Sequence, residues 1–204
     1  LTVNVGGAQG SGGMDQQSRA TMTERPELDD NAAGGLAKQL SPKLLETTRT
    51  ARRDQRSLVV MSETRLRRGS DAARRTEEAL QGAAEGWDTV ASHTPAGGDD
   101  DAAGLLVWHD SAQCEILETT ELHAGRLLQL RVRIAADGTT ITLIAAYMPP
   151  RQLAPTVAEQ ERLETVWDAL DAAADAADHA GELLMVAGDL NAETRNGLRR
   201  WGRP

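Results

Sequence analysis

Short apolar runs recur along the chain and predict a series of buried β-strands. Between residues 128 and 134 apolar and polar side chains alternate strictly, as in a strand with one buried face and one solvated face. Asp137-Gly138 then predicts a hairpin turn into the next run. We expect strands at residues 1–3, 58–61, 104–108, 114–117, 128–134, 140–147 and 183–187.

Three other segments have the features of helices. Ser41-Pro42 is a typical helix start, because serine caps the first turn and proline fits its first position. A second helix is expected at about residues 71–84, with its charged side chains on the exposed face. Residues 156–159 form a capping box that opens a long helix, and Gly181 ends this helix before the last strand.

The order strand, helix, meander, helix, strand predicts an α+β fold in which two sheets are flanked by helices. The length of 204 residues suits one domain or a large part of one. A polar, glycine-rich stretch at about residues 8–40 lacks periodicity and predicts a loop or a disordered segment.

The composition limits the class of protein. With four tryptophans, one tyrosine and no phenylalanine, the core must consist of leucine, valine, isoleucine and alanine. No apolar run is long enough to cross a membrane, and the first residues do not resemble a signal peptide. A single cysteine excludes an internal disulfide. We therefore expect an intracellular protein that has no membrane partner, and the nucleus is a candidate compartment. The sequence does not predict the oligomeric state.

Charge is distributed unevenly. The net charge of −9 argues against a protein that wraps nucleic acid. However, residues 49–75 contain nine arginines against three acidic residues, and a second basic group begins at Arg195. Arg65, Arg67, Arg68 and Arg195 are the candidates for contacts with a DNA phosphate backbone, whereas the alternative is that the arginines lie on solvated helix faces.

Polar side chains that suit metal and phosphate chemistry follow several of the predicted strands. Gly188-Asp189-Leu190-Asn191 follows the last apolar run, and Glu63 follows the run at 58–61. Carboxylate oxygens are ligands for Mg²⁺, and strand ends are where open α/β sheets place their chemistry. Each motif by itself is also compatible with an ordinary turn after a strand.

Four elements of this kind occur in a meaningful order. Each element lies at the end of a predicted strand: Asn4-Val5-Gly6-Gly7, Ser62-Glu63-Thr64-Arg65, Tyr147-Met148-Pro149 and Gly188-Asp189-Leu190-Asn191. Together they resemble the motifs of the endonuclease/exonuclease/phosphatase superfamily, in particular exonuclease III-like enzymes and the endonuclease domains of non-LTR retrotransposons. The resemblance implies a four-layer α/β/β/α sandwich, and it makes the stretch at about 8–40 an insertion.

The resemblance also implies roles for individual residues. Glu63 would be the main ligand of Mg²⁺ or Mn²⁺, and Asn4 would lie beside the metal. Asp189 would orient or deprotonate the attacking water. Asn191 and the hydroxyl group of Tyr147 would contact the scissile phosphate.

Two departures from the family pattern bear on activity. Ser62 stands where the family usually has glutamine, which is a mild change. More seriously, the Ser-Asp-His-like element that supplies an aspartate and a catalytic histidine in the family does not follow Asn191. We expect residues 1–204 to be a partial domain without its C-terminal strands. The four histidines, at 93, 109, 123 and 179, are expected to be solvated surface residues.

The sequence therefore predicts a Mg²⁺-dependent phosphodiesterase that acts on DNA, as in reverse-transcriptase-associated endonucleases, and that is incomplete as this chain. A phosphatase or phospholipase of the same superfamily is an alternative, because loops determine substrate choice. An inactive remnant that serves as a binding module is another alternative.

Overall fold

The computed structural model describes residues 2–4, 42–54, 56–96, 103–148 and 156–191. These residues form two four-stranded sheets and three helices. The first sheet, in spatial order, contains β1 (Thr2–Asn4), β2 (Leu58–Ser62), β4 (Leu105–Asp110) and β3 (Trp87–Ser92). The second contains β5 (Cys114–His123), β6 (Leu127–Ile134), β7 (Thr140–Tyr147) and β8 (Leu183–Asp189).

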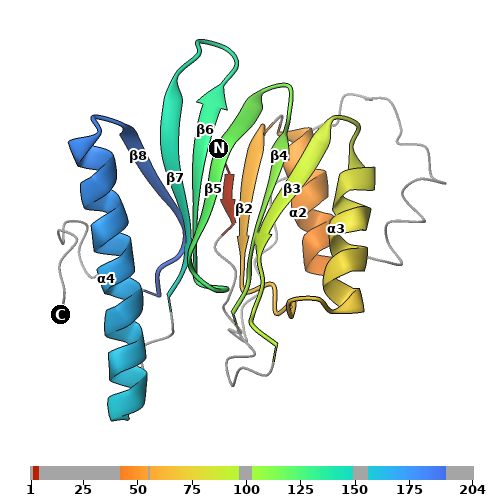
Figure 1. Ribbon diagram of the computed structural model, residues 1–204. Helices are drawn as coiled ribbons and strands as arrows, with labels where there is room; N and C mark the ends of the chain where they lie inside the picture. Colours follow the sequence, from red (N-terminus) through yellow and green to blue (C-terminus); the bar gives the residue numbers. More distant parts are fainter. Residues whose placement is uncertain (1, 5–41, 55, 97–102, 149–155, 192–204) are drawn as a thin grey trace, which may run out of the picture.

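The sheets pack face to face between layers of helices (Figure 1). The outer face of the β1–β4 sheet is covered by α2 (Pro42–Arg53) and α3 (Asp71–Ala83), and α4 (Val157–His179) lies against the β5–β8 sheet. The arrangement is the α/β/β/α sandwich that the sequence predicted.

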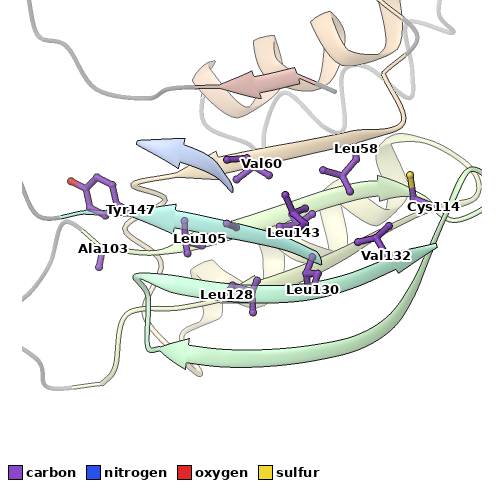
Figure 2. Close-up of a cluster of buried hydrophobic side chains, with 13 residues drawn as sticks. Leu58, Val60, Ala103, Leu105, Cys114, Leu128, Leu130, Val132, Leu143 and Tyr147 are labelled. Carbon is purple, nitrogen blue, oxygen red and sulfur yellow. The ribbon is translucent and has the colours of Figure 1, made fainter. Parts of the chain in front are cut away.

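Strand alternation sorts the apolar side chains into three layers of core. In β2, Leu58 and Val60 face the other sheet, whereas Val59 and Met61 pack against α2 and α3. A third cluster, which includes Val166, joins α4 to the second sheet. Figure 2 shows the central cluster, which the strands of both sheets line. Leucine, valine, isoleucine and alanine dominate all three clusters, as the composition predicted.

Most elements begin and end within a few residues of the expected positions. The Thr156 capping box is complete, with the Glu159 carboxylate accepting from the Thr156 backbone N–H. Ser70 caps α3 by accepting a hydrogen bond from the Ala73 backbone. Gly138 adopts a φ of 73° in the turn between β6 and β7. The capping box at Thr156 and the turn at Asp137-Gly138 therefore predicted their boundaries correctly, whereas the Ser70 cap was not predicted.

Two strands differ from the prediction. No strand was expected at Trp87–Ser92, because these residues lack a clear apolar run, yet β3 forms by antiparallel pairing with β4 along its whole length. The strand expected at 114–117 continues to His123. Its second half is exposed and polar, and pairing with β6 rather than burial supports it, with two register shifts. Tertiary pairing overrides weak local pattern in both cases.

The expectation that the histidines are solvated is wrong for two of them. His109 lies within β4, not beyond it, and is 5% exposed, with its Nδ1 next to the Cys114 carbonyl oxygen. The His93 side chain is largely buried and contacts the Glu77 carboxylate. By contrast, His179 is exposed at the last turn of α4.

The glycine-rich stretch at about 8–40 lies outside the described residues. In the part of the chain that the structure describes, none of the helices has both the length and the apolar character needed to cross a membrane.

Gly188 allows the last strand to approach its neighbour closely. Its φ is 139°, and a Cβ atom there would lie 1.9 Å from the carbonyl oxygen of Ala146. Any side chain would therefore push β8 away from β7 just before Asp189.

We expect Gly188→Ala to lower the free energy of unfolding by more than about 3 kcal/mol, because it adds both backbone strain and overlap with backbone atoms. Urea unfolding followed by tryptophan fluorescence measures the change. The control is Gly82→Ala, at an open helical position in α3. This control should raise stability by about 0.5–1 kcal/mol. A Gly188→Ala protein as stable as wild type would contradict the close approach.

Candidate active site at the strand ends

Two parallel strand pairs direct their carboxyl ends to the same edge of the sandwich. β1 pairs in parallel with β2, and β7 pairs in parallel with β8. β1 and β2 also pack against β8 across the sheet interface. The ends of these strands lie at the lower edge in Figure 1. The described ends of these strands, at Asn4, Ser62, Tyr147 and Asp189, therefore lie at one edge.

Glu63 follows β2 directly and has a constrained backbone. Its φ is 56°, in the left-handed region that residues other than glycine rarely adopt. The next two backbone N–H groups donate to the residues just before β4: Thr64 N to Gly104 O at 3.1 Å, and Arg65 N to Ala103 O at 3.0 Å. Gly104 has a φ of 120°, and a Cβ there would lie 2.3 Å from the Thr64 hydroxyl oxygen, so both the backbone conformation and the space favour glycine. The residues just before β4 thus hold the Glu63 turn in place.

Unusual backbone is concentrated at this edge. Among the described residues, the three non-glycine residues with positive φ are Glu63, Arg65 and Asn191. All three lie in the segments directly after β2 and β8. Backbone strain of this kind persists where the surrounding structure enforces it, and it is typical of functional sites.

Arg65 connects the two halves of the edge electrostatically. Its guanidinium group donates a hydrogen bond to the Glu63 carboxylate. That hydrogen bond and the charge of Glu63 raise the pKa of Arg65 above its ordinary value, and Tyr147 adds to the shift when its phenol is ionised. Glu63 belongs to the first sheet and Tyr147 to the second, so both side chains lie near the same guanidinium group.

Tyr147 ends β7 and is 4% exposed. Figure 2 shows its ring at the end of the central cluster, with the hydroxyl group pointing away from the other labelled side chains. The Arg126 guanidinium carbon lies 4.8 Å from the centroid of this ring. In the strand register, Tyr147 lies opposite Asp189. The predicted tyrosine and aspartate are therefore neighbours.

Asp189 and Asn191 form a tight turn at the end of β8. The Asp189 carboxylate accepts a hydrogen bond from the Asn191 backbone N–H at 2.9 Å. The Asn191 side-chain amide donates to the carbonyl oxygen of Met148 at 2.7 Å, and the Met148 N–H donates to the Asp189 carbonyl oxygen. These bonds fasten the turn to the end of β7. Asp189 is 8% exposed, whereas Asn191 is exposed.

The remaining predicted residues are located less completely. Asn4 ends β1, and its backbone lies opposite Met61, two residues before Glu63. Arg195 lies outside the described residues. Arg67 and Arg68 are exposed on the segment that runs from Glu63 along the edge toward β3, and Arg68 forms an ion pair with Glu121. Other arginines of the basic segment lie on α2 and α3, where Arg74 forms ion pairs within its helix.

The donor set fits a metal held by few protein ligands. Within the described ranges, no group of three or more histidine, cysteine, aspartate or glutamate side chains could bind a metal ion. Mg²⁺ often takes only one or two carboxylates together with water and substrate phosphate. The Glu63 carboxylate, largely buried and kept in position by a strained turn, is the group that suits this mode of binding.

Two positions important to this edge were missed by sequence reasoning. Arg126 precedes β6 and is only 4% exposed, although arginine is seldom buried. Gly104 was expected to begin a strand, but it precedes β4 and its carbonyl oxygen accepts the hydrogen bond from Thr64 in the turn after Glu63. In the sequence, Arg126 is a charged residue directly before a strictly alternating strand. Many exposed residues occupy such positions, so the sequence did not indicate that Arg126 is buried.

Comparison with solved structures supports the fold. An AP endonuclease from Leishmania major is 16% identical, with a TM-score of 0.54 over 79% of this chain and 54% of that chain. An endonuclease/exonuclease/phosphatase family protein from Bacteroides thetaiotaomicron is 13% identical, with a TM-score of 0.53 over 84% of this chain and 62% of that one. A mannosyl-6-phosphatase from the same organism is 10% identical, with a TM-score of 0.50 over 81% and 61%.

The chain therefore has the fold of the endonuclease/exonuclease/phosphatase superfamily, as the strand-end motifs predicted. It spans between 54% and 62% of the length of these three proteins. No protein-family model and no curated protein matches the sequence. Because the solved structures include both a nuclease and a sugar phosphatase, the fold alone does not determine the substrate.

A polar network, buried at Ser92 and exposed at Arg68 and Glu121, fastens the segment after Glu63 to both sheets. The Glu121 carboxylate accepts hydrogen bonds from the Ser92 hydroxyl at 2.6 Å and from Arg68 at 2.6 and 2.5 Å. The Ser92 hydroxyl in turn accepts from the Gly125 N–H at 2.7 Å. Partial burial alone would raise the pKa of Glu121, but the hydrogen bonds from Ser92 and Arg68 and the Arg68 charge hold it below its ordinary value.

We expect Glu121→Gln to lower the free energy of unfolding by about 0.5–1 kcal/mol at neutral pH, because it weakens the charged hydrogen bonds to Arg68, which solvent partly screens. Since folding lowers the pKa of Glu121, its contribution is present above the ordinary value of 4.5 and is lost as the pH falls through the folded-state pKa. Urea unfolding at a series of pH values measures both effects. The control is Glu118→Gln, an exposed position on the same strand. An equal effect of the two variants, or one independent of pH, would contradict this role.

Proposed function

We propose that the chain is a phosphodiesterase domain that hydrolyses phosphate esters of DNA with Mg²⁺ or Mn²⁺, as in the endonuclease domains of non-LTR retrotransposons. The observation that carries the proposal is the convergence of Glu63, Tyr147 and Asp189, each at the end of a different strand, around one edge of the sandwich. Phosphoryl transfer requires mainly positioning and charge neutralisation, and a rigid set of strand ends supplies both.

Each side chain has a distinct role in the proposal. Glu63, with Asn4 beside it, would hold the cation, which neutralises phosphate charge and makes bound water more acidic. Asp189 orients or deprotonates the attacking water, and its hydrogen bond from the Asn191 N–H keeps the carboxylate in one orientation. The Tyr147 hydroxyl and the Asn191 side chain contact the scissile phosphate.

DNA is the proposed substrate because basic side chains extend from the site along the edge. Arg65 and Arg67 follow Glu63 directly and are exposed. Arg65 forms an ion pair with Glu63, and Arg68 forms one with Glu121, so part of the positive charge of this segment is compensated within the protein. The likeness to a mannosyl-6-phosphatase favours the second candidate, a phosphatase or phospholipase of the same superfamily.

The proposed hydrolysis is tested with two substrates that differ in their leaving group. A nitrophenolate leaves a phosphodiester without a proton from the protein, whereas a sugar oxygen of DNA is helped by a general acid. The residues assigned to the proposed site include no general acid, so we expect Mg²⁺- or Mn²⁺-dependent hydrolysis of bis(nitrophenyl) phosphate and little nicking of supercoiled plasmid. Glu63→Gln and Asp189→Asn should each lower kcat/KM by about a hundredfold or more.

The matched control is Glu118→Gln, which removes an exposed carboxylate far from the strand ends and should leave the rate unchanged. A folded protein without metal-dependent hydrolysis of either substrate would contradict the function. Hydrolysis that survives Glu63→Gln and Asp189→Asn would contradict the site. Strong plasmid nicking would show that the chain needs no further general acid, and binding of DNA without hydrolysis would favour the binding module.

Metal affinity gives an independent prediction. With one main carboxylate ligand, Mg²⁺ should bind the free protein weakly, with a Kd in about the millimolar range. Titration calorimetry or the Mn²⁺ electron spin resonance signal measures it, and Glu63→Gln should weaken binding further. Tight binding that neither Glu63→Gln nor Asp189→Asn affects would place the metal elsewhere.

A further inference from the structure

Arg126 is a buried cation that contacts Tyr147 in several ways. It is 4% exposed at the turn before β6. Its guanidinium carbon lies 4.8 Å from the centroid of the Tyr147 ring, and its Nη1 lies 3.4 Å from the Tyr147 carbonyl oxygen. The backbone N–H of Tyr147 donates to the Arg126 carbonyl oxygen at 2.8 Å. The backbone and the side chain of Arg126 therefore both hold the end of β7.

Burial gives this contact more energetic weight than a surface contact would have. Removing a guanidinium group from water is costly, so such groups are kept where surrounding dipoles and rings compensate. A cation over an aromatic face is attracted more strongly when it is desolvated than at an exposed site. In a medium of low polarity its charge also acts strongly on neighbouring ionisable groups.

Charged groups of both signs surround Tyr147. Arg126 lies over the ring, from the turn between β5 and β6. Arg65, after β2, donates a hydrogen bond to Glu63, and its charge favours the ionised form of the tyrosine. Asp189, on β8, lies opposite Tyr147 in the strand register. Arg126 and Arg65 favour the phenolate, whereas Glu63, Asp189 and burial favour the neutral phenol.

We infer that Arg126 is a positioning residue for the proposed phosphodiesterase site and that it acts through Tyr147. It holds the ring at the end of β7, and its fixed charge makes the Tyr147 hydroxyl a stronger hydrogen-bond donor toward a phosphate oxygen. This inference rests on the proposed function for the hydrolytic role, but the coupling of Arg126 to Tyr147 is independent of it. Arg126 itself need not touch the substrate.

The sequence makes the coupling directly measurable, because Tyr147 is its single tyrosine. Isotope-labelled tyrosine gives one ring-carbon signal in the nuclear magnetic resonance spectrum, and its shift with pH reports ionisation of this hydroxyl alone. Removing the charge with Arg126→Met should raise the midpoint of ionisation by about one pH unit or more. Arg126→Lys keeps a charge but loses the flat stacking surface, and should give a smaller upward shift.

The matched control is Arg133→Met, which removes an arginine from the far end of β6, where it pairs with Glu115. This variant should leave the midpoint unchanged. Equal midpoints in wild type, Arg126→Met and Arg126→Lys would overturn the inference. If Arg126→Met does not fold, as judged by tryptophan fluorescence, Arg126→Lys decides: a midpoint identical to wild type overturns the coupling.

Hydrolysis of bis(nitrophenyl) phosphate tests the second half of the inference. Arg126→Met should lower kcat about tenfold with little change in KM, and Arg126→Lys should restore part of the rate. A shifted midpoint with an unchanged rate would overturn the positioning role. If the wild-type chain hydrolyses no substrate, the proposed function fails, and the titration still decides whether Arg126 controls Tyr147.

Discussion

The face-to-face packing of two sheets whose parallel strand pairs end at the same edge is the constraint on which the site depends. Parallel pairing directs β1 with β2, and β7 with β8, toward one edge, and the central apolar cluster fixes the sheets against each other. The polar residues that follow these strands meet without long loops. Gly188 is the position that tolerates a side chain least, because β8 approaches β7 closely there and Asp189 then lies opposite Tyr147.

The strand ends are then locked by a second level of interactions. The Glu63 turn is held by backbone hydrogen bonds to the residues just before β4, and the Asn191 turn is held by the end of β7. Both turns contain residues with positive φ, so the surrounding structure bears their strain. In the proposed function, strand ends locked in this way would need little reorganisation when an anionic substrate binds, which favours electrostatic catalysis.

Most of the fold and part of the site could be predicted from local sequence. Strict alternation at 128–134 and the Thr156 capping box are decided by near neighbours, and both were correct. The positions of Glu63, Tyr147 and Asp189 at strand ends were predicted because each lies at or directly after the end of an apolar run. β3 and the burial of His109 were missed, since they depend on pairing with β4 and on packing across the sheets. Arg126 was missed for the same reason: only tertiary structure shows that a charge at a strand start is buried under a ring.

The most direct test of the account is paramagnetic broadening by Mn²⁺ in the nuclear magnetic resonance spectrum, which detects even weak binding. If the strand ends form one metal-dependent site, Mn²⁺ will broaden the signals of Glu63, Tyr147 and Asp189 together, and Glu63→Gln will abolish the effect. Broadening scattered over exposed carboxylates, or unchanged in Glu63→Gln, would contradict a single site at this edge.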